Sequence, residues 1–235
     1  MRAMPSPTAH PPWTGFPEPS HRTRIKICGL TREDDVDAAV AAGADAIGFV
    51  LYAKSPRAVT PERAAELARR LPPFVTPVLL FVNASADEIA HALAQVPQAL
   101  LQFHGDETPA QCQAPGRAYL RAVRMGAPGV DLLDSAARYH DAQALLLDAH
   151  VDGYGGGGKA FDWSLIPLGV PLPVVLSGGL NPANVTDGVL RVRPWAVDVS
   201  SGVESAKGVK DAGLMRRFCE NVREADARLA LPSEE

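Results

Sequence analysis

From residue 24 onwards, short apolar runs alternate with longer stretches of helical spacing, and this alternation limits the possible folds. The runs are rich in Val, Ile, Leu and Ala, as buried parallel strands are. We count eight, at residues 25–28, 46–51, 77–82, 99–103, 119–123, 144–148, 173–176 and 196–199. Clear helical stretches lie between them or after the last, at residues 33–42, 61–70, 86–95 and 210–229.

Several helices begin with recognisable capping residues. Thr31 precedes a run of acidic residues, and Thr60 is followed by a proline at the first helical position. Ser85 and Glu88 have the spacing of a capping box. These caps support the helical assignments independently of the apolar pattern.

Strict alternation of strand and helix predicts a parallel sheet, and eight units in about 210 residues fit a closed (β/α)8 TIM barrel. An open doubly wound sheet is the alternative, which strand count alone does not reject. The weakly patterned stretch 112–128 makes the fourth and fifth units the least defined. We predict a Pro-rich disordered leader at 1–23, one catalytic barrel at 24–229 and a tail at 230–235.

Composition excludes several functional classes. A net charge of −4 argues against a nucleic-acid partner, and no apolar run reaches the roughly 18 residues of a membrane span. The three cysteines are far apart and form no CxxC pair, so we expect no structural metal and no disulfide framework. This pattern is typical of a reducing compartment, and we expect a cytoplasmic protein.

In this fold the active site lies where the strands end and the βα loops begin. Cys28 ends the first strand on the same face as Lys26, and a cation nearby can lower the pKa of a thiol enough to make it a base. Asp148 ends an apolar strand, where burial favours a protonated acid that can donate its proton. The alternatives are a packed core cysteine and an aspartate that braces a loop.

Two further loops carry candidate binding residues. Arg57 follows the second strand, and its planar fork suits a carboxylate or a phosphate. His104 follows the fourth strand and could orient a substrate or move a proton, although bonding to a neighbouring loop is equally consistent with the sequence.

Glycine-rich loops predict a phosphate site. Barrel enzymes often bind phosphate with the loops after strands seven and eight, which here contain Gly178-Gly179 and Ser200-Ser201-Gly202. Residues 153–159 nominally fit the nucleotide-binding pattern GxxxxGK, but Ala160 stands where Ser or Thr would hold magnesium. Asp162 also resembles a helix cap, so a helix would start too late. We therefore expect an anion-binding loop and no NTPase.

Together these stretches resemble the phosphoribosylanthranilate isomerase family, from about Arg24 to Arg223. Each motif is short, but the ordered set is specific. The matching stretches are Lys26-Ile-Cys-Gly-Leu-Thr31, Gly48-Phe49 with Ser55-Pro56-Arg57, Leu101-Gln-Phe-His-Gly105, Leu147-Asp148, Tyr154-Gly-Gly-Gly-Gly-Lys159 with Phe161-Asp162-Trp163, Leu176-Ser-Gly-Gly-Leu-Asn181 and Asp198-Val-Ser-Ser-Gly-Val-Glu204 with Gly208-x-Lys210-Asp211.

The resemblance implies a cofactor-free Amadori rearrangement in tryptophan biosynthesis, with no metal. N-(5-phosphoribosyl)anthranilate would become 1-(2-carboxyphenylamino)-1-deoxyribulose 5-phosphate, with Asp148 as the acid and Cys28 as the base. Arg57 would hold the anthranilate carboxylate. His104 and Asp198 would line the substrate pocket. The phosphate would contact backbone groups of Gly155, Gly156, Gly178, Gly179, Ser200, Ser201 and Gly202.

Three features depart from the family pattern. Gly157 stands where a threonine is usual, which removes one hydroxyl contact, and Lys207 replaces the usual proline before Gly208. The leader has no counterpart in the family. The resemblance leaves the assembly open between a monomer and a homodimer.

Two other functions compete with this one. The related isomerase of histidine biosynthesis would need an aspartate at Cys28 and a second phosphate site. A non-catalytic phosphate-binding barrel would need neither Cys28 nor Asp148.

Overall fold

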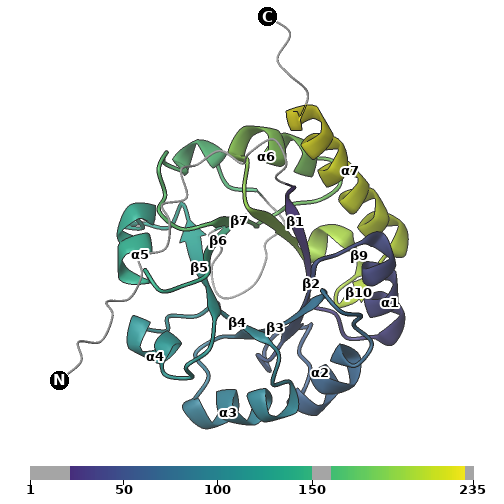
Figure 1. Ribbon diagram of the computed structural model, residues 1–235, viewed down its shortest axis with the longest axis vertical. Helices are drawn as coiled ribbons and strands as arrows, with labels where there is room; N and C mark the ends of the chain where they lie inside the picture. Colours follow the sequence, from purple (N-terminus) through teal and green to yellow (C-terminus); the bar gives the residue numbers. More distant parts are fainter. Residues whose placement is uncertain (1–21, 150–159, 231–235) are drawn as a thin grey trace, which may run out of the picture.

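Eight parallel strands close into a barrel in the computed structural model, which describes residues 22–149 and 160–230 (Figure 1). The closure joins β1 to β8, with Lys26 in register with Asp198. This confirms the closed barrel over the open sheet, and each strand lies within two residues of its predicted range. The strands are β1 (Arg24–Cys28), β2 (Ala46–Val50), β3 (Thr76–Phe81), β4 (Leu100–Phe103), β5 (Tyr119–Met125), β6 (Ala144–Ala149), β7 (Val174–Leu176) and β8 (Ala196–Val199).

Helices surround the strands as an outer ring (Figure 1). They are α1 (Glu33–Ala42), α2 (Pro61–Ala68), α3 (Ala86–Gln95), α4 (Pro109–Gln113), α5 (Leu132–Arg138), α6 (Val185–Val192) and α7 (Ala212–Ala230). The weakly patterned units contain the short helices α4 and α5. Between β6 and β7, the described residues form only the 3-10 turn η1 (Trp163–Leu165), and Asp162 is its N-cap, as predicted.

Local capping explains where several helices begin. The Thr60 side chain accepts from the Arg63 N–H at the start of α2, and Ser85 and Glu88 form the predicted capping box of α3. The prediction for Thr31 was wrong, because Arg32 occupies the cap position of α1 and makes no side-chain cap bond. The Thr31 hydroxyl instead donates to the Gly208 carbonyl, 3.1 Å away, so it joins two loops.

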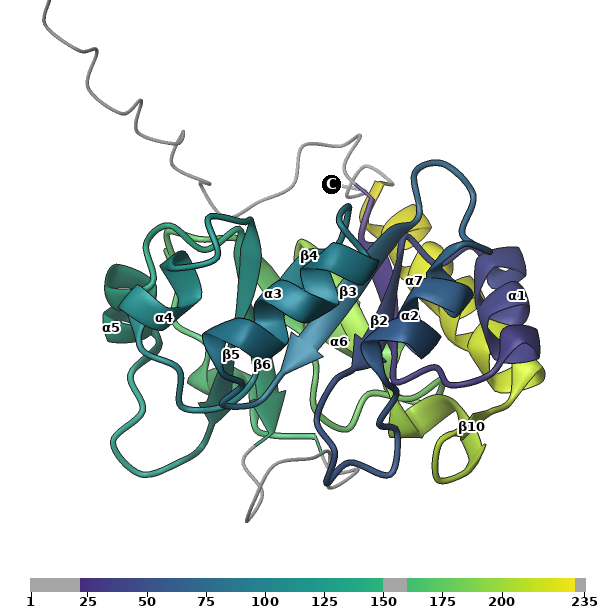
Figure 2. The ribbon, with the colours of Figure 1, turned by 90° about the horizontal axis from the view of Figure 1, so that it is seen from below.

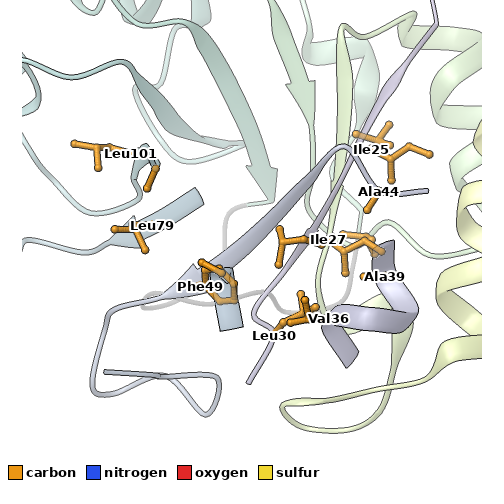
Figure 3. Close-up of a cluster of buried hydrophobic side chains, with 14 of the residues drawn as sticks. Ile25, Ile27, Leu30, Val36, Ala39, Ala44, Phe49, Leu79 and Leu101 are labelled. Carbon is orange, nitrogen blue, oxygen red and sulfur yellow. The ribbon is translucent and has the colours of Figure 1, made fainter. Parts of the chain in front are cut away.

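Two apolar layers hold the barrel together. Outward side chains of the strands, such as Ile27, pack with Leu30 and with Val36 of α1 (Figure 3). A separate cluster fills the barrel interior and consists of Leu120, Ala122, Ala144, Leu146, Val175 and Ala196. Since side chains alternate along each strand, the inner positions beyond this cluster face the mouth.

A small antiparallel hairpin follows β8. It consists of β9 (Glu204–Ala206) and β10 (Val209–Lys210), and Figure 2 shows β10 at the end towards which the arrowhead of β3 points. The prediction of a helix from residue 210 was therefore early by two residues, since Lys210 lies in β10 and α7 begins at Ala212.

The chain just before β1 is tied to the barrel. Thr23 is buried and donates twice to the Asp226 carboxylate, from its N–H at 2.8 Å and its hydroxyl at 2.6 Å. Arg22 forms a two-point ion pair with Asp45. Both residues fall inside the range that we assigned to the leader.

Across the described residues, no helix combines the length and apolar character needed to span a bilayer.

Candidate active site

One pocket opens at the carboxyl ends of the barrel strands and encloses about 760 Å³ of space, including the part open to solvent. Its walls come from both halves of the barrel. The predicted site residues that border it are Cys28, Arg57, His104, Asp148, Gly178, Gly179, Asp198, Ser200 and Ser201. The structure therefore brings most of the predicted site together.

Cys28 faces the pocket from the end of β1 and is only 4% exposed. Gly48 on β2 gives the sulfur its space, because a Cβ at Gly48 would lie 2.6 Å from Sγ. Burial raises the pKa of the Cys28 thiol, and the cations of Lys26 and Lys210 oppose this rise without cancelling it. The group is therefore mainly a thiol at neutral pH, held beside charges that favour its thiolate.

A buried ion pair lies beneath Cys28. The Lys26 ammonium donates to the Asp198 carboxylate over 2.8 Å, and the Ser177 hydroxyl donates to the other oxygen over 3.4 Å. Burial alone would lower the pKa of Lys26, but Asp198 and Cys28 outweigh it and raise this pKa. Lys26 therefore stays charged inside the barrel.

Asp148 is the last residue but one of β6 and contacts His104 across the pocket. Its Oδ2 lies 3.0 Å from the His104 Nε2, and its Oδ1 accepts from the Ala149 N–H over 3.0 Å. The other ring nitrogen of His104, Nδ1, lies 3.0 Å from the Gln102 Nε2. Three polar side chains from β4, the following loop and β6 thus form a chain that ends at the predicted acid.

Arg57 borders the pocket and is braced by the hairpin. Its Nε and Nη2 donate to the two oxygens of Glu204 over 2.7 and 2.8 Å. Lys210 donates to the same carboxylate over 2.8 Å and to the Ser200 carbonyl over 3.0 Å. Nη1 is the guanidinium nitrogen that does not bond to Glu204.

The two predicted phosphate loops meet at one side of the mouth. Gly178 and Gly179 have φ values of +76° and +71°, which disfavour any residue with a side chain. Gly202 does not border the pocket; a Cβ there would lie 1.9 Å from the Leu180 carbonyl oxygen, so this glycine lets the two loops touch. The 3-10 turn η2 (Ser201–Val203) begins at this place.

Some predicted residues lie elsewhere, and some site residues were missed. Gly155, Gly156 and Gly157 fall outside the described residues. Gln102 and Glu204 stand in quoted motifs, but we gave them no role. Alternation along β4 could have placed Gln102 in the barrel, whereas nothing in the sequence pairs Glu204 with Arg57.

Comparison with known proteins gives a consistent result. The family model described as N-(5'-phosphoribosyl)anthranilate (PRA) isomerase matches residues 25–221. A protein of that name from Leptothrix cholodnii is 76% identical over 207 residues, which are 88% of this chain and 94% of the relative. One from Methylibium petroleiphilum is 75% identical over 209 residues, which are 89% of this chain and 98% of the relative.

Solved structures agree with the fold. The phosphoribosylanthranilate isomerase of Thermotoga maritima aligns with a TM-score of 0.79 and 41% identity, covering 86% of this chain and 99% of that one. A structure of a phosphoribosylanthranilate isomerase in complex with reduced 1-(o-carboxyphenylamino)-1-deoxyribulose 5-phosphate aligns with a TM-score of 0.74 and 38% identity, covering 86% of this chain and 99% of that one. The chain therefore belongs to the N-(5'-phosphoribosyl)anthranilate isomerase family.

Proposed function

We propose that this pocket isomerises N-(5-phosphoribosyl)anthranilate to 1-(2-carboxyphenylamino)-1-deoxyribulose 5-phosphate, with Asp148 as the general acid and Cys28 as the general base. Family membership supports the reaction, which belongs to tryptophan biosynthesis. The observation that carries the assignment of roles is that Cys28 on β1 and Asp148 on β6 border one pocket from different strands. An acid and a base can then act on different atoms of one substrate.

The first step opens the furanose ring. Asp148 gives its proton to the ring oxygen, the bond between this oxygen and C1 breaks, and the nitrogen lone pair forms the C=N bond of a Schiff base. The hydrogen bond between His104 Nε2 and Oδ2 supports this role, because it holds the carboxyl group in one orientation at the pocket wall.

The second step removes the proton at C2. The Cys28 thiolate takes this proton, the C2–H electron pair forms the C1=C2 bond, and the π pair of the C=N bond returns to nitrogen. The resulting enolamine tautomerises to the ketone. Burial raises the pKa of the thiol, so a small thiolate fraction carries the reaction at neutral pH, and its basicity is correspondingly high.

The walls of the pocket suit the two ends of the substrate. Val50, Leu80 and Val82 offer an apolar surface beside Cys28 for an aromatic ring. Arg57 would bind the anthranilate carboxylate through Nη1, and Asp198 would contact the sugar hydroxyls.

The phosphate would rest on backbone N–H groups of the loops after β7 and β8. The residues are Gly178, Gly179, Ser200, Ser201 and Gly202, with Gly155 and Gly156 from the segment outside the described residues. A short helical turn after β8 is the usual setting of phosphate in such barrels, and η2 occupies that place.

The test is a fluorescence assay that follows the loss of phosphoribosylanthranilate, made in situ, in the presence of excess chelator. We expect turnover by the purified protein without added cofactor or metal. Cys28→Ser and Asp148→Asn should each lower kcat on the order of 10²-fold or more. A folded protein with no turnover, or variants with unchanged kcat, would contradict the proposal.

Two broader features are also proposed. We expect a cytoplasmic enzyme, supported by its three free cysteines, Cys28, Cys112 and Cys219, all buried. We expect a monomer or a homodimer. Cell fractionation and sedimentation equilibrium would check these two expectations.

A further inference from the structure

We propose that Gln102 is a positioning residue whose side-chain amide holds the His104 ring in place in both proton states of the His104–Asp148 pair. The inference rests on the proposed role of Asp148 as the acid. Neither the sequence motifs nor the reaction steps described above assign a role to Gln102. This role adds Gln102 to His104 and Asp148 on the acid side of the site.

Gln102 is placed for this role by its strand. It is fully buried, at 0% exposure, and borders the pocket from the inner face of β4, whereas its neighbours Leu101 and Phe103 pack in the outer layer. An inward polar side chain at this depth costs free energy unless it is bonded. Its bond is the one from Nε2 to the His104 Nδ1, 3.0 Å long.

The other amide atom supplies the second observation. Among the described residues, the Gln102 Oε1 is buried and has no hydrogen-bond partner. Within this part of the chain, the orientation of the amide is therefore decided by its bond to His104. An amide that turns by 180° offers a donor or an acceptor at the same place.

Each orientation fits one proton state of the imidazole. With Nε2 towards the ring, Nδ1 must accept, so the ring proton lies on Nε2 and points at the Asp148 carboxylate. With Oε1 towards the ring, Nδ1 carries a proton, and Nε2 can hold a second one or accept from a protonated Asp148. The amide thus accommodates both states without moving the ring.

This gives a route for reloading the acid. Since the Asp148 Oδ1 accepts from the Ala149 N–H, the acidic proton belongs on Oδ2, which faces His104. After Asp148 has given its proton to the ring oxygen, solvent adds a proton to Nε2 of the neutral imidazole, whose Nδ1 already carries a proton bonded to Oε1. The Nε2–H bond of this imidazolium then breaks and the O–H bond on Oδ2 forms, which restores the neutral imidazole and the protonated acid.

The experiment compares Gln102→Met, which removes both amide atoms at similar size, with Gln102→Glu, which keeps an acceptor opposite Nδ1. Gln98→Met is the matched control, because Gln98 is exposed and lies before β4. The readouts are kcat and KM, and the 15N chemical shifts of the His104 ring, assigned with His104→Asn.

We expect Gln102→Met to lower kcat about ten-fold or more while KM changes less than about three-fold, as loss of an orienting partner does. Its His104 15N shifts should differ from those of the parent protein, because Nδ1 has lost its partner. Gln102→Glu should recover most of the lost kcat and show both nitrogens protonated, and Gln98→Met should match the parent protein.

The inference is overturned if Gln102→Met keeps its kcat and His104 shifts, if only KM rises, or if Gln102→Glu loses as much kcat as Gln102→Met. Asp148→Asn separates this result from failure of the proposed function. An active Asp148→Asn variant removes the acid role itself, whereas an inactive one with an unaffected Gln102→Met variant removes only the role of Gln102.

Discussion

The Cys28 thiol lies between opposing influences that set its proton affinity. Burial among apolar side chains disfavours the thiolate, while Lys26 and Lys210 favour it, and burial is the stronger of the two. A base with a raised pKa is scarce in its active form at neutral pH but strong once formed. The site therefore gains reactivity as the pH rises.

We predict that iodoacetamide alkylates Cys28 faster with increasing pH, with a midpoint above about pH 8.5, the ordinary value for a thiol. Lys26→Met should move the midpoint higher still, because it removes a cation that favours the thiolate. Mass spectrometry of the Cys28 peptide gives the rates. A midpoint below about 8.5, or a downward move in the variant, would refute this account.

The other two cysteines serve as internal controls. Both are fully buried, and burial raises the pKa of Cys112 to about 12 and that of Cys219 to about 11. Neither should be alkylated in the folded protein over the same range. Labelling of all three at one rate would mean that the reagent reports unfolding.

The position of the Cys28 sulfur depends on the absence of a side chain at Gly48. In Gly48→Ala the new methyl group would lie 2.6 Å from Sγ, so the base must shift. We expect kcat to fall on the order of 10²-fold, the effect of a displacement of about 1 Å at a reacting group. Adding Cys28→Ala should reduce the destabilisation by Gly48→Ala, as measured by urea unfolding. An equal cost in both backgrounds would show that Sγ is not the obstacle.

At the scale of elements, the β9–β10 hairpin acts as a brace for Arg57. Burial alone would raise the pKa of Glu204, but the bonds from Arg57 and Lys210 outweigh it and hold this pKa below its ordinary value. The ionised carboxylate thus stabilises the fold above about pH 4.3, the unfolded value, and this contribution disappears as the pH falls through the folded pKa.

Glu204→Gln should destabilise the protein by about 3 kcal/mol at pH 7, because the buried Lys210 and the part-buried Arg57 lose their shared partner. The difference from the parent protein should shrink as the pH falls below about 4.3. Urea unfolding at a series of pH values measures it. A difference that stays constant down to acid pH would exclude this ion pair as its source.

The same elements show what can be predicted from a sequence and what cannot. The caps at Thr60 and Ser85 were predictable because each cap bonds within four residues of the sequence. The shared location of Cys28 and Asp148 at one pocket was predictable because strand ends converge in a barrel. The bond from Arg57 to Glu204 spans 147 positions and depends on how two loops meet, so no local pattern contains it. The predicted capping role of Thr31 was wrong for this reason, since its hydroxyl donates to Gly208 in a loop far along the chain.

For the whole molecule, the junction between β1 and β8 closes the barrel and joins the two ends of the fold. Helix α7 packs between α1 and α6 beside this junction (Figure 1). From α7, Asp226 reaches back to Thr23, just before β1, so residues 203 positions apart are bonded at the seam. We propose that the catalytic domain, set at 24–229 from the sequence, includes Arg22 and Thr23.

A chain that begins at Arg22 and one that begins at Arg24 test this boundary. The shorter chain loses two bonds to the Asp226 carboxylate and the ion pair of Arg22 with Asp45. Losing these bonds to a charged group should cost about 2 kcal/mol of stability. The Tm of the shorter chain should therefore be lower by about 4–8 °C, as measured by calorimetry. Asp226→Ala should lower the Tm of the longer chain by a similar amount and hardly affect the shorter one, because in the latter its Thr23 partner is already gone. Equal melting temperatures for the two chains would place the boundary at residue 24.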